Sequence, residues 1–376
     1  MSQKERNSRK NGEVQVETSL ADIQEYIKSK TKEIDDEIRK YLTEKTSDRY
    51  IKNLLGNSGF KFHEESIDKS IMEPIIYLLN MGGKRLRPIM TLLTIEAFGK
   101  RGDDFMEFAI VPEIVHTGTL IHDDMEDKTD LRRGALAVHK KFGEDIALNV
   151  GDFLFFFPLG AVIDSRRIDI PTKYAIVSEL MRTMRGLGLG QGSDLAWHNN
   201  LVEDVGSIKV ENYMQMCYGK TGALTSFAMK LGAILAGAKR EDVEKMGLFG
   251  GSIGVAFQIE DDILNLKKSK LSDNKGGVGD DITEGKMTLM AIYAINNAPK
   301  KDSDRLLQIL RMHTKDKKLI DEAIGILESS GAIDFANSTK YEIISKAWKA
   351  VENILPDSES KARMRQLAEM IVHRSV

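Results

Sequence analysis

Scarcity of proline constrains this fold more than any other feature of the sequence. Only 7 of the 376 residues are proline, so uninterrupted helices are sterically possible almost everywhere. Apolar residues recur at helical spacing along most of the chain, whereas no segment shows sustained alternation with Val, Ile and Thr enrichment. The pattern predicts an all-α fold, and we place no sheet in it.

The periodicity separates an N-terminal extension, residues 1–45, from one large domain, residues 46–376. Residues 1–17 carry alternating charges and almost no apolar periodicity, which predicts disorder. Apolar residues between 20 and 38 recur at helical spacing and predict an amphipathic helix. Further helices are predicted at 68–80, 86–99, 104–124, 142–163, 172–187, 207–216, 219–237, 241–266, 284–297, 302–314, 317–330, 333–353 and 358–373.

Charge and cysteine content exclude several classes of protein. Lys and Arg number 54 against 57 Asp and Glu, which gives no global electrostatic reason to bind nucleic acid or a membrane. A single cysteine, Cys217, excludes an internal disulfide and suits a reducing compartment, so we expect a cytoplasmic protein. The polar N-terminus lacks a signal peptide, and the longest aromatic apolar run is interrupted by Pro158, so we expect a soluble protein without membrane insertion.

Two acidic clusters, HDDMED and FQIEDDILN, each end a strongly apolar helical segment. Asp123 and Asp127 share a helix face, while Asp124 points about 100° away. Carboxylates gathered without cysteine call for hard, oxygen-preferring ions, above all Mg²⁺, which usually bridges to substrate phosphates. A solvated acidic helix end is the alternative for either cluster alone, but the pair favours a metal site.

Closely spaced cations accompany these clusters. Lys84, Arg85 and Arg87 follow two glycines in GGKRLRP, and a proline then opens a helix, which makes a plausible diphosphate cradle. Arg132 and Arg133 follow the first acidic cluster in LRRG. Taken singly these motifs are unspecific, because a glycine pair also breaks helices and an arginine pair is often a surface patch.

With these motifs in order, the chain resembles the trans-isoprenyl diphosphate synthases, or polyprenyl synthetases, over about residues 70–290, and among them the geranylgeranyl diphosphate synthases. GGKRLRP looks like the isopentenyl diphosphate loop of that family, HDDMED with LRRG like its first aspartate-rich motif, and FQIEDDILN like the second. GQGSDLAW, KTG and GDDITEGKMTL also stand where the family has them. Two departures are Asn265, where many members have a third Asp, and Leu136, where Pro is usual.

The resemblance implies a role for each matching residue. The diphosphate of isopentenyl diphosphate would be held by Lys84, Arg87, His116 and Arg133. The allylic diphosphate would be held by Arg132, Lys220, Lys275 and Lys286. Three Mg²⁺ ions would be coordinated by Asp123, Asp127 and Asp261. The catalytic site around the allylic cation would be formed by Lys220, Thr221 and Gln258.

The resemblance also implies a bundle of long helices around a deep cavity, a single catalytic domain at 46–376 and a homodimer. Its reaction is a Mg²⁺-dependent prenyl transfer that joins isopentenyl diphosphate to an allylic diphosphate and releases diphosphate. A terpene cyclase or squalene-synthase-like enzyme would not need the second diphosphate site that GGKRLRP and LRRG indicate. A silent regulatory subunit would usually lack the first Asp cluster, and a plain helical interaction protein would leave the ordered motifs as coincidence.

Product length is predicted from the helix that carries Asp123. Thr119 and Gly118 lie four and five residues before it, about 6–7.5 Å along the helix axis, and Val115 lies one turn deeper. In the resembling family, bulky aromatics at these positions stop the product at farnesyl diphosphate, whereas Gly118 would leave the cavity open. We therefore expect geranylgeranyl diphosphate (C20) or a longer product. Farnesyl diphosphate remains the alternative, because Gly118 could instead permit close helix packing while another helix supplies the cavity floor.

Overall fold

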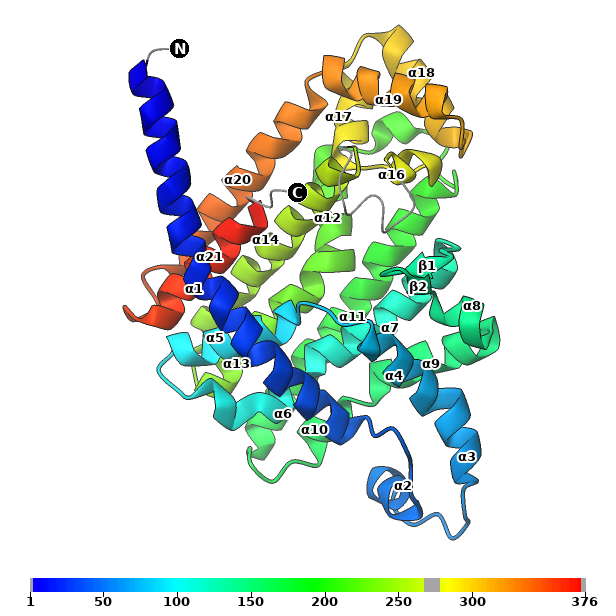
Figure 1. Cartoon of the computed structure of the whole chain (residues 1–376), viewed down its shortest axis with the longest axis vertical. Coiled ribbons are helices and arrows are strands. Elements are labelled where there is room, and N and C mark those ends of the chain that lie inside the picture. Colours follow the sequence, from blue (N-terminus) through cyan, green and yellow to red (C-terminus); the bar gives the residue numbers. More distant parts are fainter. Residues whose placement is uncertain (1–2, 267–277, 373–376) are drawn as a thin grey trace.

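The computed structural model describes residues 3–266 and 278–372, with the side chains of α1 described from Leu20 onward. Its fold is all-α, as predicted, with helices joined by turns and loops (Figure 1). The N-terminal half contains α1 (Gln3–Tyr41), α2 (Asp48–Leu55), α3 (Glu64–Ile67), α4 (Glu73–Asn80), α5 (Leu86–Ala97), α6 (Met106–Ala109), α7 (Val111–Glu126), α8 (Val138–Phe142), α9 (Glu144–Phe156), α10 (Leu159–Ile163) and α11 (Ile170–His198). The C-terminal half contains α12 (Val210–Cys217), α13 (Ala223–Ala236), α14 (Arg240–Asn265), α16 (Asp280–Thr283), α17 (Leu289–Asn297), α18 (Lys300–Arg311), α19 (Lys317–Ser329), α20 (Ala332–Val351) and α21 (Glu359–Val372). Short 3-10 or π-helical turns lie at Asp68–Met72, Gly102–Phe105, Val205–Ser207 and Tyr218–Gly222.

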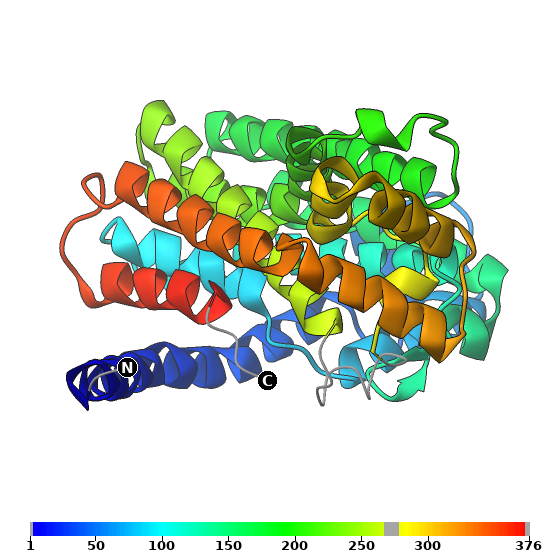
Figure 2. The same cartoon turned by 90° about the horizontal axis from the view of Figure 1, so that it is seen from above.

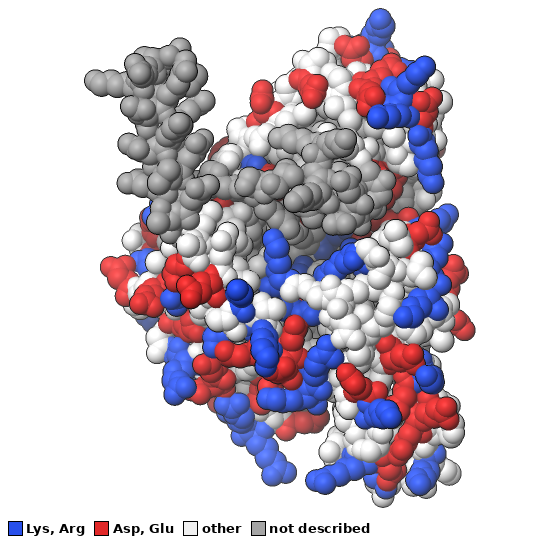
Figure 3. Space-filling view, in the orientation of Figure 1, with Lys and Arg blue, Asp and Glu red and all other residues white. Residues whose placement is uncertain are grey.

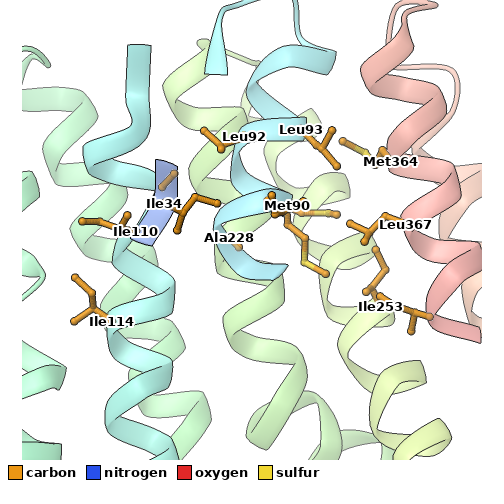
Figure 4. Close-up of a cluster of buried hydrophobic side chains, with 14 of the residues drawn as sticks. Ile34, Met90, Leu92, Leu93, Ile110, Ile114, Ala228, Ile253, Met364 and Leu367 are labelled. Carbon is orange, nitrogen blue, oxygen red and sulfur yellow. The ribbon is translucent and has the colours of Figure 1, made fainter. Parts of the chain in front are cut away.

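Helix α5 lies inside the bundle, and side chains from several helices pack around it. Figure 4 shows this cluster, whose side chains are at most 2% exposed and come from α1, α5, α7, α13, α14, α21 and the residue between α6 and α7: Ile34, Met90, Leu92, Leu93, Ile110, Ile114, Ala228, Ile253, Met364 and Leu367. Figure 2 shows α1 running along one side of the bundle beside α21. The N-terminal extension therefore shares a core with the large domain.

Helix α1 begins earlier than predicted. The sequence indicated disorder over residues 1–17, whereas the helix begins at Gln3. Glu, Lys, Arg and Gln in this segment are good helix formers, and extending an anchored helix requires no new nucleation. From Leu20 onward the helix is amphipathic as predicted, and Ile23 and Ile34 on its inner face are fully buried.

Helix α11 continues beyond its predicted end. Helix was predicted only over 172–187 because three glycines follow, but α11 continues to His198. Gly190 has a packing reason, since a Cβ there would lie 2.2 Å from the backbone nitrogen of Lys220. This glycine lets α11 approach the turn Tyr218–Gly222 and brings Lys220 against α11.

A two-residue hairpin corrects the prediction that the chain contains no sheet. Strand β1 (Leu131–Arg132) pairs antiparallel with β2 (Ala135–Leu136). Arg133 and Gly134 between them have φ values of 52° and 81°, and a tight hairpin turn of this kind needs two positive φ angles. Arginine rarely adopts such a φ, so the Arg-Gly pair gave no hairpin signal.

Helices α9 and α10 form a strongly apolar segment. Residues Glu144–Ile163 are long and apolar enough by composition to cross a membrane, with a mean hydropathy of 1.9, and 39% of that window is buried. In the structure the segment is two helices separated at Pro158, with α9 packed against α7. Its outer side leaves Phe156 68% and Ile163 53% exposed.

Candidate active site

A polar cavity lies between α11, α12, α14 and the segment that leads into α17. Its lining residues are Asp194, Tyr213, Met216, Cys217, Lys220, Thr221, Gln258, Asp262, Asp281, Lys286, Met287 and Thr288. Four of them were predicted for the allylic substrate: Lys220, Thr221, Gln258 and Lys286. In Figure 3, lysine and arginine side chains border a hollow near the middle of the molecule. The structure therefore brings together residues from motifs that are far apart in the sequence.

Two lysines contact the first acidic cluster. Lys220 Nζ lies 3.2 Å from Asp123 Oδ1 and 2.6 Å from Asp194 Oδ2. Lys286 Nζ lies 3.2 Å from Asp127 Oδ2. Burial disfavours the charge of Asp123, but Lys220 and Lys286 outweigh it and hold the pKa of this carboxyl below its ordinary value. Asp123 is therefore ionised, and both it and Asp127, the residue after the end of α7, pair with lysines that line the cavity.

Lys286 also connects the first acidic cluster to acidic residues of the GDDITEGK segment. It forms an ion pair with Glu284 and lies 3.9 Å from Asp281 Oδ1. Burial raises the pKa of Glu284 to about 7, although Lys286 opposes the shift. Burial and the nearby Asp281 raise the pKa of Asp262 to about 8. The half-buried Lys286 therefore compensates the negative charge of Asp127 and Glu284 on this side of the cavity.

Asp262 is the centre of a hydrogen-bond network at the end of α14. Its carboxylate accepts from Tyr213 Oη at 2.7 Å and from Gln258 Nε2 at 2.9 Å. The side-chain oxygen of Gln258 in turn accepts from Thr221 Oγ1 at 3.0 Å. These bonds fix Gln258 and Thr221, the two residues predicted to lie beside the allylic cation.

Glu260 belongs to the same acidic cluster but pairs with a residue of another helix. It forms an ion pair with Lys340 of α20, and the two side chains are only 6% and 4% exposed. Asp261, the predicted metal ligand, follows it and is half-buried. Glu260 is therefore a structural anchor that ties the end of α14 to α20.

A second group of cations gathers at the start of α5. The Nε of Arg87 is buried and has no hydrogen-bond partner among residues 3–266 and 278–372. Burial, followed by Arg87 and Arg133, lowers the pKa of His116 well below its ordinary value, so this imidazole is neutral. Burial and then Arg85 lower the pKa of Arg133. Lys84 is exposed in the loop just before α5. Cationic side chains this close together favour the binding of an anion.

Arg132 forms an ion pair with a carboxylate that the sequence did not suggest as its partner. Its Nε donates to Asp124 Oδ1 at 2.9 Å and to Oδ2 at 3.0 Å, and Asp124 is only 1% exposed. Arg132 Nη2 lies 4.0 Å from Asp123 Oδ2. Asp124, which was predicted to point away from Asp123, thus holds Arg132 at the edge of the acidic cluster.

Gly118 does not open a channel as expected. A Cβ at this position would lie 2.9 Å from the carbonyl oxygen of Gly151 and 3.1 Å from Phe155 Cε1, so the glycine permits close packing of α7 against α9. Val115 is fully buried in an apolar cluster that Phe155 adjoins. Thr119 donates its hydroxyl to a carbonyl oxygen of its own helix at 2.8 Å. The alternative interpretation of Gly118, close packing with a floor supplied by another helix, fits these contacts.

The acidic residues suit Mg²⁺ ions for which the substrate supplies some of the ligands. In the part of the chain that the structure describes, no three Asp, Glu, His or Cys side chains gather closely enough to hold an ion alone. Asp123 and Asp127 offer only oxygen donors, on one helix face, next to lysines that suit phosphate. Mg²⁺ is usually held in this way, by one or two carboxylates together with water and substrate phosphates.

Some site residues escaped the sequence analysis, and one predicted residue cannot be placed. Asp194 and Tyr213 line the cavity, and the only sequence signal for Asp194 was its place in the weak GQGSD motif. Asp262 also lines it; it belongs to the second acidic cluster but was given no role of its own. Gln191 of the same motif donates to Glu126 and, at 3.5 Å, to Asp123. Lys275, predicted for the allylic diphosphate, lies outside the described residues.

Comparison with known proteins agrees with this site. The family model for polyprenyl synthetase matches residues 68–327. A short chain isoprenyl diphosphate synthase from Methanothermobacter thermautotrophicus is 36% identical over 298 residues, which cover 79% of this chain and 88% of that protein.

Solved structures share the fold. Geranylgeranyl pyrophosphate synthetase from Pyrococcus horikoshii is 31% identical, with a TM-score of 0.79 over 94% of this chain and 99% of the other. A polyprenyl synthase from Caulobacter crescentus, complexed with calcium and isoprenyl diphosphate, is 25% identical, with a TM-score of 0.75 over 95% and 97% of the two chains. The chain belongs to the polyprenyl synthetase family, as its motifs indicated, and is a prenyltransferase with the all-α fold of the isoprenyl diphosphate synthases.

Proposed function

We propose that this enzyme condenses isopentenyl diphosphate with an allylic diphosphate and makes geranylgeranyl diphosphate or a longer trans-polyprenyl diphosphate. One observation carries the proposal: cations gather both at the acidic cluster and at the GGKRLRP loop. Lys220 and Lys286 lie against the acidic cluster, whereas the guanidinium of Arg133 lies beside that of Arg85 at Gly83, in the loop before α5. An enzyme that uses one diphosphate substrate, such as a terpene cyclase, needs only the first group.

The first group suits the leaving diphosphate. Breaking the allylic C–O bond places additional negative charge on this diphosphate, and Lys220 and Lys286 would stabilise that charge where it develops. Burial opposes the charge of both lysines, but neighbouring carboxylates raise the pKa of each above its ordinary value and keep them protonated. Thr221 and Gln258 would direct their oxygen atoms toward the allylic cation.

Mg²⁺, in our proposal three ions, would supply further stabilisation of the same charge, and Asp123, Asp127 and Asp261 would hold it. Binding of calcium with isoprenyl diphosphate by the Caulobacter crescentus protein supports a divalent cation here. Asp124 contributes indirectly, because it holds Arg132 beside Asp123.

The second group suits isopentenyl diphosphate. Lys84, Arg87 and Arg133 would bind its diphosphate, and the neutral His116 would donate one hydrogen bond without adding charge. The double bond of the substrate, held within near-attack distance, would then form a bond to the allylic carbon. A proton leaves the resulting cation, and we propose that the departing diphosphate accepts it.

The product chain would extend from Asp123 toward the buried apolar cluster around Val115, which α7 shares with α11 and α13. Gly118 closes against α9, where a Cβ would lie 3.1 Å from Phe155 Cε1, so Phe155 would form part of the floor. Similarity to the Pyrococcus horikoshii geranylgeranyl pyrophosphate synthetase supports a product longer than farnesyl diphosphate.

We propose further that the enzyme is a cytoplasmic homodimer with one catalytic domain, residues 46–376. A continuous set of helices exposes large apolar side chains that a second copy would cover. They lie on α9, α10 and α11: Leu148, Phe156, Ile163, Ile170, Tyr174 and Leu189. Light scattering of the wild-type protein and of a Phe156→Asp/Tyr174→Asp variant tests this, because we expect a dimer and a monomer respectively.

Two substitutions test the division between the two substrate sites. Asp123→Ala should lower turnover about a thousandfold with saturating Mg²⁺ and both substrates, and a loss below about tenfold would contradict its role. Lys84→Ala should raise KM for isopentenyl diphosphate far more than KM for the allylic substrate. Equal changes in both constants would contradict separate sites.

A further inference from the structure

A carboxylate on the N-terminal helix contacts the loop that we assign to isopentenyl diphosphate. Asp35 lies on α1, outside the residues 68–327 that match the family. Its Oδ1 accepts a hydrogen bond from Nε of Arg85, in the GGKRLRP loop, at 2.6 Å. Helix α1 also packs against α5, which this loop leads into (Figure 1). The N-terminal extension therefore reaches the proposed substrate loop directly.

Arg85 is held from a second side as well. Its Nη1 lies 3.3 Å from Glu113 Oε1 on α7, and its Nη2 donates to the carbonyl oxygen of Leu79 at 3.3 Å. Arg85 is 4% exposed and Glu113 is 5% exposed. A guanidinium this deeply buried requires paired carboxylates. Asp35 and Glu113 supply them from two different helices and so tie the loop to both.

The backbone of the loop depends on this arrangement. Arg85 has a φ of 49°, a left-handed conformation that a non-glycine residue adopts only when its surroundings fix it. It stands between Lys84 and Arg87, two of the residues proposed to bind the diphosphate, and α5 begins directly after it. The orientation of Arg85 therefore sets the direction in which these neighbours leave the loop.

The pairing of charges around the loop supports the same conclusion. Arg85 has two carboxylate partners, so its charge is compensated within the protein. Nε of Arg87, by contrast, is buried and lacks a hydrogen-bond partner within the described part of the chain. Asp35 and Glu113 therefore neutralise the charge of Arg85, which holds the loop, whereas Arg87 can bind the substrate.

We propose that Asp35 is a positioning residue for isopentenyl diphosphate: acting through Arg85, with Glu113 on the other side, it fixes the loop that carries Lys84 and Arg87. The N-terminal helix is then a working part of this substrate site. The inference rests on the proposed function of the GGKRLRP loop and assigns to the extension a role that its sequence did not indicate.

Asp35→Asn tests the inference with a matched control on the same helix. Asp36→Asn makes the same change one residue away, at a side chain that is 57% exposed and pairs with Lys32. Because a charge-assisted hydrogen bond is lost, Asp35→Asn should raise KM for isopentenyl diphosphate about tenfold. KM for the allylic substrate and kcat at saturation should stay within about twofold, as should every constant of Asp36→Asn. Asp35→Glu, which keeps the charge, should recover most of the loss.

Thermal melting of each variant separates positioning from a merely structural role. The Asp35 side chain is 34% exposed and asparagine has the same shape, so we expect Asp35→Asn to fold. If it lowers Tm but leaves KM for isopentenyl diphosphate unchanged, or raises both KM values equally, the inference is overturned. The same holds if Asp35→Glu behaves like Asp35→Asn. Failure of the wild-type enzyme to use isopentenyl diphosphate would instead overturn the proposed function.

Discussion

Removing Lys340 should destabilise the enzyme severely, because it would leave Glu260 charged and buried. The two side chains are 4% and 6% exposed and pair with each other, which joins α20 to the end of α14. Breaking a buried ion pair by removing one partner costs about 3–5 kcal/mol, since the remaining charge keeps its desolvation penalty. We therefore expect Lys340→Met to lower the free energy of unfolding by about this amount, measured by urea denaturation.

Two further variants make this prediction specific. Glu260→Leu/Lys340→Met removes both charges and should lie within about 1 kcal/mol of the wild type, because apolar replacements of a buried pair are often neutral. Lys300→Met removes a pair whose members are 91% and 65% exposed and should cost less than about 1 kcal/mol. A loss for Lys340→Met no larger than that for Lys300→Met, or a double variant as unstable as the single one, would refute the reasoning.

Three other predictions concern the cavity and its helices. Phe155→Ala should shift the product toward longer chains by lowering the proposed floor, and an unchanged product length in an active variant would remove Phe155 from that role. Gly118→Ala should lower the free energy of unfolding by about 1–3 kcal/mol, because its Cβ would meet the backbone of α9, whereas Gly188→Ala in α11, where a Cβ meets nothing within 4 Å, should not destabilise. In metal-free protein, the pKa of Asp262 rises from 3.8 to about 8, so the folded state holds a proton that the unfolded state has lost. Between these pH values the free energy of unfolding should fall as pH rises, by at most about 1.4 kcal/mol per pH unit. Asp262→Asn should abolish this slope. Equal pH profiles of unfolding free energy for the two proteins would show that Asp262 does not titrate in this way.

Motifs along single helices could be predicted from the sequence. Helical spacing predicts that Asp123 and Asp127 share a face, and in the structure both carboxylates pair with lysines that line the cavity. Lys220 and Lys286, assigned through the family resemblance, line one cavity. Such inferences need only the local geometry of a helix or a resemblance carried by short motifs, and the roles of these residues stay predictions.

Contacts between distant elements could not be predicted in this way. Periodicity shows which face of a helix is buried but does not show which helix covers it, so the partners of Arg85, Glu260 and Lys220 became visible only in the structure. For the same reason Gly118 was expected to open a channel, whereas it packs against α9. Helix α11 continues past its glycines because close packing outweighs their low helix propensity.

The central claim is that the enzyme extends an allylic diphosphate with isopentenyl diphosphate beyond farnesyl diphosphate. The most direct test incubates the purified protein with Mg²⁺, isopentenyl diphosphate and farnesyl diphosphate, and identifies the products by mass spectrometry. We predict geranylgeranyl diphosphate or longer polyprenyl diphosphates, with one diphosphate released for each isopentenyl unit added. Recovery of unchanged farnesyl diphosphate, or its conversion without consumption of isopentenyl diphosphate, would contradict the claim.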